Sequence, residues 1–348
     1  MPSQTYERYG LTGNPFRDLA SESLEDVGIF HVNQEVDETL RTLREEVYDK
    51  ENRAFVAITG ALGAGKTERL LLTAAEGRER GVFTVYFDLT SKTEWVLRGL
   101  AASIHKTADT AKVAKTFSSP PWLREIGALE KAKGDKYDPK EAGRVIAAAL
   151  NDRAPSLLLL NDLHNLAETP EVDAFVDMLQ ETVDAIRPGV LVMFSAYASY
   201  VAWLTTYHPA FATRINRTLL LAGLSDDEAG LVLAKKMLAK RVVEDLDPTF
   251  PFDPDAVKQL NRAAAGNPRR LIELADLALE YGIAHRAYRI DAELVETVLA
   301  ERQAPTRPAA DPVGPERLAK GPSMTPYQPP ATRKPTAIAG QPPWSESP

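Results

Sequence analysis

The stretch Gly60–Thr67, which reads GALGAGKT, has the residue types and the spacing of a phosphate-binding loop. Glycines permit backbone conformations that other residues avoid, so successive N–H groups can converge on phosphate oxygens. Lys66 can reach the outer phosphates of a triphosphate, and the Thr67 hydroxyl can bind magnesium. All fixed positions of the Walker A pattern are present, so we expect a nucleoside triphosphate and Mg²⁺ to bind here. The residues expected at the nucleotide are Gly60, Gly63, Gly65, Lys66, Thr67 and Glu68.

The segments on either side of this loop have the patterns needed to position it. An apolar run over 54–58 predicts a strand, and the spacing of Leu70, Leu71 and Ala74 predicts a helix that ends at Gly81. A helix that begins at the loop directs its unpaired N–H groups and the positive end of its dipole at the same anion. Strand, loop and helix therefore occur in the order that phosphate binding requires.

Further apolar runs alternate with helical patterns as far as residue 224. Strands are expected at 82–87, 156–160, 190–194 and 218–221, and helices at 36–48, 92–105 and 140–150. Thr169-Pro170-Glu171 predicts another helix start, because a capping threonine, an early proline and an acid in the first turn are typical of helix N-termini. This alternation predicts an α/β fold, a P-loop NTPase parallel sheet with helices on both faces.

From residue 225 onward the pattern is helical only. Ser225–Glu228 is a capping box, and Asp253-Pro254, Asn267-Pro268 and Asp291 predict three further helix starts. The last 46 residues are rich in proline and lack periodicity, which predicts disorder. We expect a nucleotide-binding domain over 1–224, a small all-helical lid domain over 225–302 and a disordered proline-rich tail over 303–348.

The composition of the chain excludes several kinds of site and of binding surface. The chain has 49 acidic and 41 basic residues, and a net charge of -8 argues against a broad nucleic-acid-binding face. The absence of cysteine excludes disulfides, thiol catalysis and cysteine-ligated metals. There is no signal-peptide pattern and no apolar run of the roughly 20 residues that span a bilayer, so we expect a cytoplasmic protein with no membrane contact.

The order of these parts resembles that of AAA+ ATPases. Within that class, Leu157–Leu166 and Gly266–Leu271 are most similar to the origin-recognition initiator clade. The lid motif and Asn14-Pro15-Phe16 are also similar to secretion-associated ExeA-type ATPases. The resemblance covers residues 10–302 and implies ATP binding. The winged-helix DNA-binding domain that follows the lid in initiators is expected to be lacking, because a proline-rich tail follows instead.

The chain departs from the family at the acidic motif. In the family the strand ends in Asp-Glu, where the first acid organises magnesium and the second activates water; in that register this chain has Asn161 and Asp162. If the motif is aligned one residue later, Asp162 takes the metal-side position and Leu163 takes the position of the acid that activates water. Either register lacks one acid, so we expect slow hydrolysis. The alternative is a buried strand whose polar end has no catalytic task. The expected metal ligands are Thr67, Asn161 and Asp162.

Three other residues match family positions near the γ-phosphate. Ser195 matches sensor 1, Arg269 matches sensor 2, and Arg214 matches the arginine finger, with Arg217 as a second candidate. Arg269 and Arg270 fall in the first turn of a helix, where the dipole disfavours each cation by about 0.3–1 kcal/mol, and a bound phosphate would reverse that cost. Ordinary turn chemistry for the serine and surface ion pairs for the arginines are the alternatives. The expected catalytic residues are Lys66, Asp162 and Arg214.

The segment Phe30–Gln34 falls where the family lines its adenine pocket, so His31 or Tyr9 could stack on the base. His164 has no second histidine at metal-ligand spacing, and we expect no transition-metal site.

These features together predict an ATP- and Mg²⁺-dependent switch with weak ATPase activity. The nucleotide state would control self-association or binding of protein partners through the nucleotide face. A role in DNA replication or another DNA transaction stays open, with contact through the lysine-rich insertion at 106–140 or through a bound partner. The alternative is a non-hydrolysing ATP-binding scaffold or signalling module that assembles protein partners.

Overall fold

The computed structural model describes residues 4–17, 32, 34–89, 96–111, 119–131, 137–243 and 245–303. The chain divides by its contacts into two units, Met1–Arg307 and Pro308–Pro348, and every described residue belongs to the first. The domain boundary near residue 224 lies within that unit and stays a prediction. The proline-rich tail from residue 304 onward lies outside the described residues, as does part of the lysine-rich insertion.

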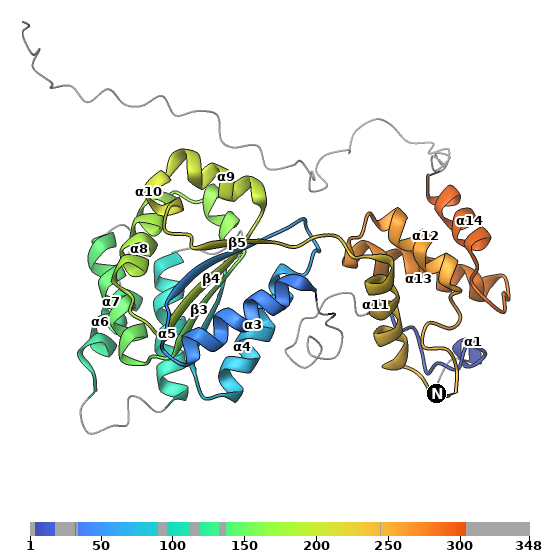
Figure 1. The fold of residues 1–348 in the computed structure, drawn as a ribbon, viewed down its shortest axis with the longest axis horizontal. Helices are drawn as coiled ribbons and strands as arrows, with labels where there is room; N and C mark the ends of the chain where they lie inside the picture. Colours follow the sequence, from blue (N-terminus) through green and yellow to red (C-terminus); the bar gives the residue numbers. More distant parts are fainter. Residues whose placement is uncertain are drawn as a thin grey trace, which may run out of the picture. The chain divides into compact units, whose positions relative to one another are not determined.

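A five-stranded parallel sheet confirms the predicted fold class (Figure 1). In the order β2-β3-β4-β1-β5, its strands are β1 (Ala54–Thr59), β2 (Phe83–Asp88), β3 (Ser156–Asn161), β4 (Val190–Ala196) and β5 (Arg217–Leu220). Every residue of β1, β3 and β4 is buried, which is why these strands are continuous apolar runs and not alternating ones. Because the strands are parallel, their carboxyl ends lie at one edge of the sheet.

Helices cover both faces of this sheet (Figure 1). One face packs against α3 (Glu35–Tyr48) and α4 (Lys66–Glu79) through a core that includes Leu40, Leu70 and Met193. The other face carries a larger core, in which Phe55 lies 5.3 Å, between ring centroids, from both Phe194 and Phe211. The helices on this face are α5 (Val96–Thr110), α6 (Pro121–Lys131), α7 (Pro139–Asp152), α8 (Val172–Ala185), α9 (Ala198–Tyr207) and α10 (Pro209–Ala212).

The helices after residue 225 share a separate core with the N-terminal segment, which begins with α1 (Gln4–Glu7). Tyr9 is fully buried there, and its hydroxyl donates to the Ala287 carbonyl at 2.6 Å. Tyr9 is therefore not available to stack on a nucleotide base, which corrects that alternative. No sequence pattern indicated that the first residues pack with the last helices. These helices are α11 (Asp226–Leu238), α12 (Pro254–Ala264), α13 (Pro268–Ala284) and α14 (Ala292–Gln303).

One predicted helix start is wrong. The segment Leu163–Glu168 forms a 3-10 helix, and the Thr169 hydroxyl donates to the Leu166 carbonyl at 2.9 Å. Thr169 therefore closes this preceding turn, and α8 begins only at Val172. The capping box at Ser225–Glu228 is confirmed. None of the described helices is long and apolar enough to cross a membrane.

Two helical glycines provide a matched test of the packing beside the sheet. A Cβ at Gly143 on α7 would lie 2.5 Å from the Met178 carbonyl oxygen of α8, whereas a Cβ at Gly127 on α6 would meet no atom within 4 Å. We expect Gly143→Ala to lower the free energy of unfolding by about 1–3 kcal/mol through overpacking. Gly127→Ala should raise it by about 0.5–1 kcal/mol, because alanine restricts the unfolded chain and favours helix.

Urea denaturation of the two variants checks this prediction. A free energy of unfolding for Gly143→Ala at or above the wild-type value would contradict the close contact between α7 and α8.

Candidate nucleotide-binding site

The glycine loop connects β1 to α4 in the way the sequence predicts. Gly63 and Gly65 have φ values of +77° and +90°, in the region that side chains other than glycine rarely adopt. Gly65 is the residue that caps α4, and a Cβ there would lie 2.6 Å from the Arg69 guanidinium. The backbone conformation therefore requires glycine at Gly65, and a larger residue would also have to displace the end of the Arg69 side chain. The N-terminal N–H groups of α4 begin at Lys66, directly after the loop.

Lys66 is a buried cation, with 6% of the residue exposed. Its ammonium donates to the carbonyl oxygens of Gly60 at 3.1 Å and Ala61 at 2.9 Å, and it lies 4.7 Å from the centre of the Tyr197 ring. Burial lowers the pKa of Lys66, and the negative charge of Asp162 opposes that change. The loop carbonyls thus compensate a charge that has been removed from water.

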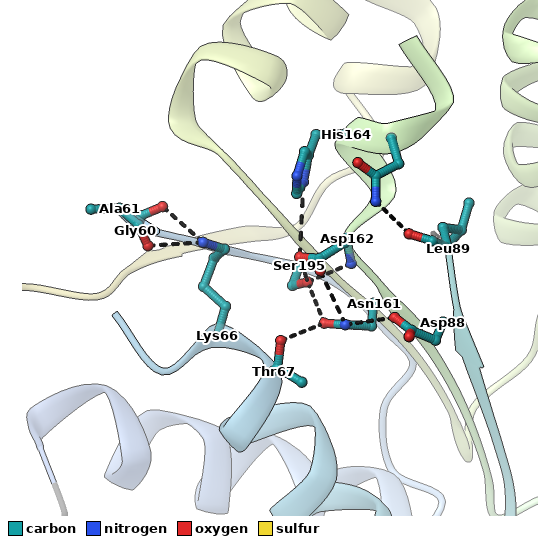
Figure 2. Close-up of polar contacts among 11 residues, drawn as sticks. Gly60, Ala61, Lys66, Thr67, Asp88, Leu89, Asn161, Asp162, His164 and Ser195 are labelled. Atoms are coloured by element: carbon teal, nitrogen blue, oxygen red, sulfur yellow. Dashed lines mark hydrogen bonds and ion pairs between the residues drawn. The ribbon is translucent and has the colours of Figure 1, made fainter. Parts of the chain in front are cut away.

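Polar side chains from three strands and from α4 meet around Asn161 (Figure 2). The hydroxyls of Thr67 and Ser195 both donate to Asn161 Oδ1, at 3.0 and 2.8 Å. The Asn161 amide nitrogen donates to Asp88 Oδ1 at 2.8 Å and to Asp162 Oδ2 at 3.3 Å. Asn161 is therefore the residue of the acidic motif that contacts Thr67. This contact matches the register in which Asn161 is on the metal side.

Asp162 follows β3 with φ 55° and ψ 48°, in the left-handed region. Aspartate is one of the few residues besides glycine that adopt this conformation, and residues in it are concentrated at functional sites. The Asp162 N–H donates to Ser195 Oγ at 2.7 Å, which stabilises the turn. Burial raises the pKa of the Asp162 carboxyl; Lys66 opposes this rise and Asp88 adds to it. Ser195 is fully buried and contacts the acidic motif instead of lining the pocket.

Two aromatic side chains next to Asp162 were not predicted from the sequence. The Tyr197 ring, directly after β4, lies 4.0 Å from the His164 ring between centroids. His164 Nδ1 is 3.9 Å from Asp162 Oδ1 and makes no hydrogen bond within the described part of the chain. Burial, with a smaller effect from Lys66, lowers the pKa of His164 to about 4, so the imidazole is neutral at pH 7.

Arg269 of α13, the residue that matches sensor 2 in the sequence, lies beside the glycine loop. A Cβ at Gly63 would lie 2.7 Å from the Arg269 Cβ, so the two backbones approach closely. The Asn267 side chain caps α13 by accepting from the Arg270 N–H at 3.1 Å, and it donates to the Leu62 carbonyl at 2.6 Å. One amide therefore both begins the helix and connects it to the loop.

A pocket of about 370 Å³ opens at this loop, within the usual size range of ligand sites. Its polar lining includes Gly63, Gly65, Lys66, Thr67, Glu68, Asp162 and Arg269. Its apolar lining includes Val32, which belongs to the segment Phe30–Gln34 that the family resemblance places at the adenine. It also includes Leu224, Val232 and Ile272, which the sequence did not indicate. These three residues lie far from the loop in the chain, so no local pattern could have revealed them.

The fold and site geometry allow comparison with solved structures. The ORC2 protein of Aeropyrum pernix, solved in ADPNP-ADP complexes, is 13% identical with a TM-score of 0.54, covering 83% of this chain and 72% of that one. The Aeropyrum pernix ORC1 protein, in complex with DNA, is 18% identical with a TM-score of 0.50, covering 82% and 69%. Cdc6p from Pyrobaculum aerophilum is 13% identical with a TM-score of 0.50, covering 79% and 70%.

The chain has an AAA+ fold. This confirms the predicted likeness to the initiator clade at the level of fold. No protein-family profile and no curated protein sequence matches the chain.

The oxygen atoms beside the loop of this AAA+ fold suit a magnesium ion. The Thr67 hydroxyl, the Asn161 amide oxygen and the Asp162 carboxylate are hard donors, which Mg²⁺ prefers. Magnesium at nucleotides is usually bound by one or two carboxylates together with phosphates and water. Two neutral oxygens and one carboxylate are fewer ligands than the six that Mg²⁺ takes, so phosphate oxygens and water would complete the set. Among the described residues no group of three or more His, Cys, Asp or Glu side chains could hold a metal.

Two predicted residues do not join this cluster. Arg214 follows α10 and pairs with Asp184 of α8 at 2.9 Å, and Arg217 is exposed at the start of β5. Neither is among the residues that line the pocket. His31, the remaining candidate for base stacking, lies outside the described residues.

The lowered pKa of His164 predicts a pH dependence of stability. The folded protein leaves this imidazole neutral down to about pH 4, whereas the unfolded chain binds the proton below about pH 6.5. Because the unfolded state binds more protons in this window, the free energy of unfolding should fall by about 1–2 kcal/mol as the pH drops from 7 to 5. His164→Gln should remove that part of the pH dependence.

Denaturant titrations at pH 7 and pH 5 measure the effect, with His285→Gln as the control that removes an exposed imidazole. Equal pH dependence in His164→Gln and wild type would show that His164 titrates normally.

Proposed function

We propose that this protein binds ATP with Mg²⁺ at the loop Gly60–Thr67 and uses the bound nucleotide as a switch. The observation that carries the proposal is the buried Lys66 ammonium in a pocket that also contains Arg269 and the N-terminus of α4. Four basic side chains against two acidic ones line this pocket, and together with a helix N-terminus they favour a ligand of high negative charge. A triphosphate would replace the loop carbonyls as the acceptor for Lys66.

The apolar part of the pocket lining supports a purine base as the rest of the ligand. Val32, Val232 and Ile272 offer a surface on which a base can pack, while the loop binds its phosphates. Adenine as the base rests on the resemblance to AAA+ ATPases and on the Aeropyrum pernix relative solved with ADPNP and ADP.

The acidic motif supports slow hydrolysis. In this proposal Asn161 and Thr67 hold the metal through neutral oxygens, and Asp162 is the carboxylate that receives the proton of the attacking water. The raised pKa of Asp162 makes it a stronger base once it is ionised. With one acid where the family has two, chemistry should be slower than binding and release.

The contacts of α13 support the switch. Arg269 and Asn267 connect the helices after residue 225 to the glycine loop, so the presence of a γ-phosphate would bias the position of those helices. The domain division near residue 224 is part of this proposal, because the two parts must move relative to each other.

Assembly is the proposed output of the switch. The exposed ion pair between Arg214 and Asp184 contributes little stability, so Arg214 can be released to act on the nucleotide of a neighbouring copy.

Contact with DNA, as in the Aeropyrum pernix ORC1 complex, would need a local basic segment or a partner, because the net charge of this chain is -8. We place the protein in the cytoplasm.

A non-hydrolysing ATP-binding scaffold is the second candidate. It is favoured by one observation, the neutral Asn161 at the position that contacts Thr67. The two candidates share the nucleotide site and differ in turnover.

Replacement of Lys66 tests nucleotide binding. We expect Lys66→Ala to weaken Mg-ATP binding about 10- to 100-fold, because a charge-assisted hydrogen bond to phosphate is lost. Isothermal titration calorimetry measures the dissociation constant, and Lys131→Ala, which removes an exposed lysine from the last turn of α6, is the matched control. An unchanged dissociation constant in Lys66→Ala would refute the proposed site.

Replacement of Asp162 separates the two candidate functions. Loss of a general base slows a proton transfer about 100- to 10,000-fold, so we expect Asp162→Asn to abolish measurable phosphate release while it still binds Mg-ATP. Steady-state phosphate release and calorimetry on the same preparations give the comparison. If the wild type binds Mg-ATP but releases phosphate no faster than Lys66→Ala, the protein is a non-hydrolysing scaffold.

A further inference from the structure

The acidic motif has a carboxylate partner on the neighbouring strand. Asp88 is the last residue of β2 and lies directly opposite Asn161 in the parallel register of β2 and β3. Its Oδ1 accepts a hydrogen bond from Asn161 Nδ2 at 2.8 Å (Figure 2). The two residues are 73 positions apart, and nothing in the loop or in the Leu157–Leu166 motif indicates that they pair.

This partner fixes the orientation of the Asn161 amide. The amide nitrogen faces two carboxylates, those of Asp88 and Asp162, and the amide oxygen faces two hydroxyls, those of Thr67 and Ser195. A flipped amide would place its oxygen against two carboxylates, which repel it. Asp88 therefore helps to point Asn161 Oδ1 at Thr67, the residue expected to bind magnesium.

The pair of Asp88 and Asn161 also determines which of the two strands carries the negative charge. An aspartate at position 161 would bring a second carboxylate within hydrogen-bond distance of Asp88, and two such groups do not both ionise readily. Asparagine at 161 avoids that repulsion and leaves one negative charge on the pair, on β2 instead of β3.

We propose that Asp88 is a positioning residue that supplies, through Asn161, the negative charge that retains the divalent cation of a bound nucleotide. In this arrangement the acid that serves the metal is at the end of β2 instead of at the end of β3. The inference rests on the proposed nucleotide site and adds a residue to it. The chemistry recognised is a divalent cation that Thr67 and Asn161 would help to hold together with a bound triphosphate.

Asp88→Asn isolates the charge, because an asparagine at 88 can still accept from the Asn161 amide. The full chain is titrated with a fluorescent non-hydrolysable ATP analogue over a range of Mg²⁺ concentrations and, separately, in EDTA. We expect Asp88→Asn to raise the Mg²⁺ concentration at half-maximal binding about 5- to 50-fold. In EDTA the same variant should bind the analogue at least as tightly as wild type, because an acid near the phosphates has been removed.

The double variant Asp88→Asn/Asn161→Asp moves the charge to β3 and keeps one charge on the pair. We expect it to bring the Mg²⁺ midpoint back to within about threefold of wild type, since the charge then lies closer to the metal. Asp109→Asn is the control, because it removes the same charge from an exposed position on α5.

Three results would overturn the inference. They are an unchanged Mg²⁺ midpoint in Asp88→Asn, an equal loss of binding in EDTA and in Mg²⁺, or a double variant no better than Asp88→Asn. If wild type binds no analogue at saturating Mg²⁺, the proposed nucleotide site itself is wrong and this inference is overturned with it. If the wild type binds the analogue and Asp88→Asn does not shift the Mg²⁺ midpoint, only the role of Asp88 is rejected.

Discussion

The buried ammonium of Lys66 is the constraint on which the rest of the site depends. A cation removed from water needs dipoles or anions around it, and here the Gly60 and Ala61 carbonyls, the Tyr197 ring and the nearby charge of Asp162 meet that need. These partners come from the loop and from the ends of two strands. A parallel sheet brings those strand ends to one edge, so the fold places the groups that stabilise the buried charge of Lys66.

Asn161 has an equally central position among the neutral groups. Its amide separates two carboxylates from two hydroxyls, and each of its four hydrogen bonds runs to a different residue. An ionised carboxylate in its place would accept from the hydroxyls but could donate nothing to Asp88 or Asp162. The departure from the family pattern at position 161 is thus matched to its surroundings, because the Asn161 amide can donate to the carboxylates of both Asp88 and Asp162.

The helices after residue 225 contribute to the site through side chains that contact the backbone of the loop. Asn267 donates to the Leu62 carbonyl, and Arg269 lies against Gly63, where no side chain could fit. The N-terminal segment packs in the core of these same helices through Tyr9 and Phe16. A change in the position of these helices would therefore act on the first residues of the chain as well as on the loop.

The sequence by itself determined the loop, the buried strands and most helix starts. These depend on local properties: glycine conformations at Gly63 and Gly65, continuous apolar runs such as 156–160, and capping residues such as Ser225 and Asn267. The family motif singled out Arg269, and its role at a nucleotide stays a prediction. The local prediction at Thr169 was wrong because its hydroxyl closes the 3-10 helix before it.

Only the tertiary structure decided which residue of the acidic motif contacts Thr67, and that Asp88 pairs with Asn161. It also decided that Tyr9 is buried away from the pocket and that Val232 and Ile272 line it. In each case the partners are far apart in the chain and become neighbours through strand order or helix packing. Periodicity and capping report the environment of a residue within its own element, whereas these contacts depend on how separate elements are placed against one another.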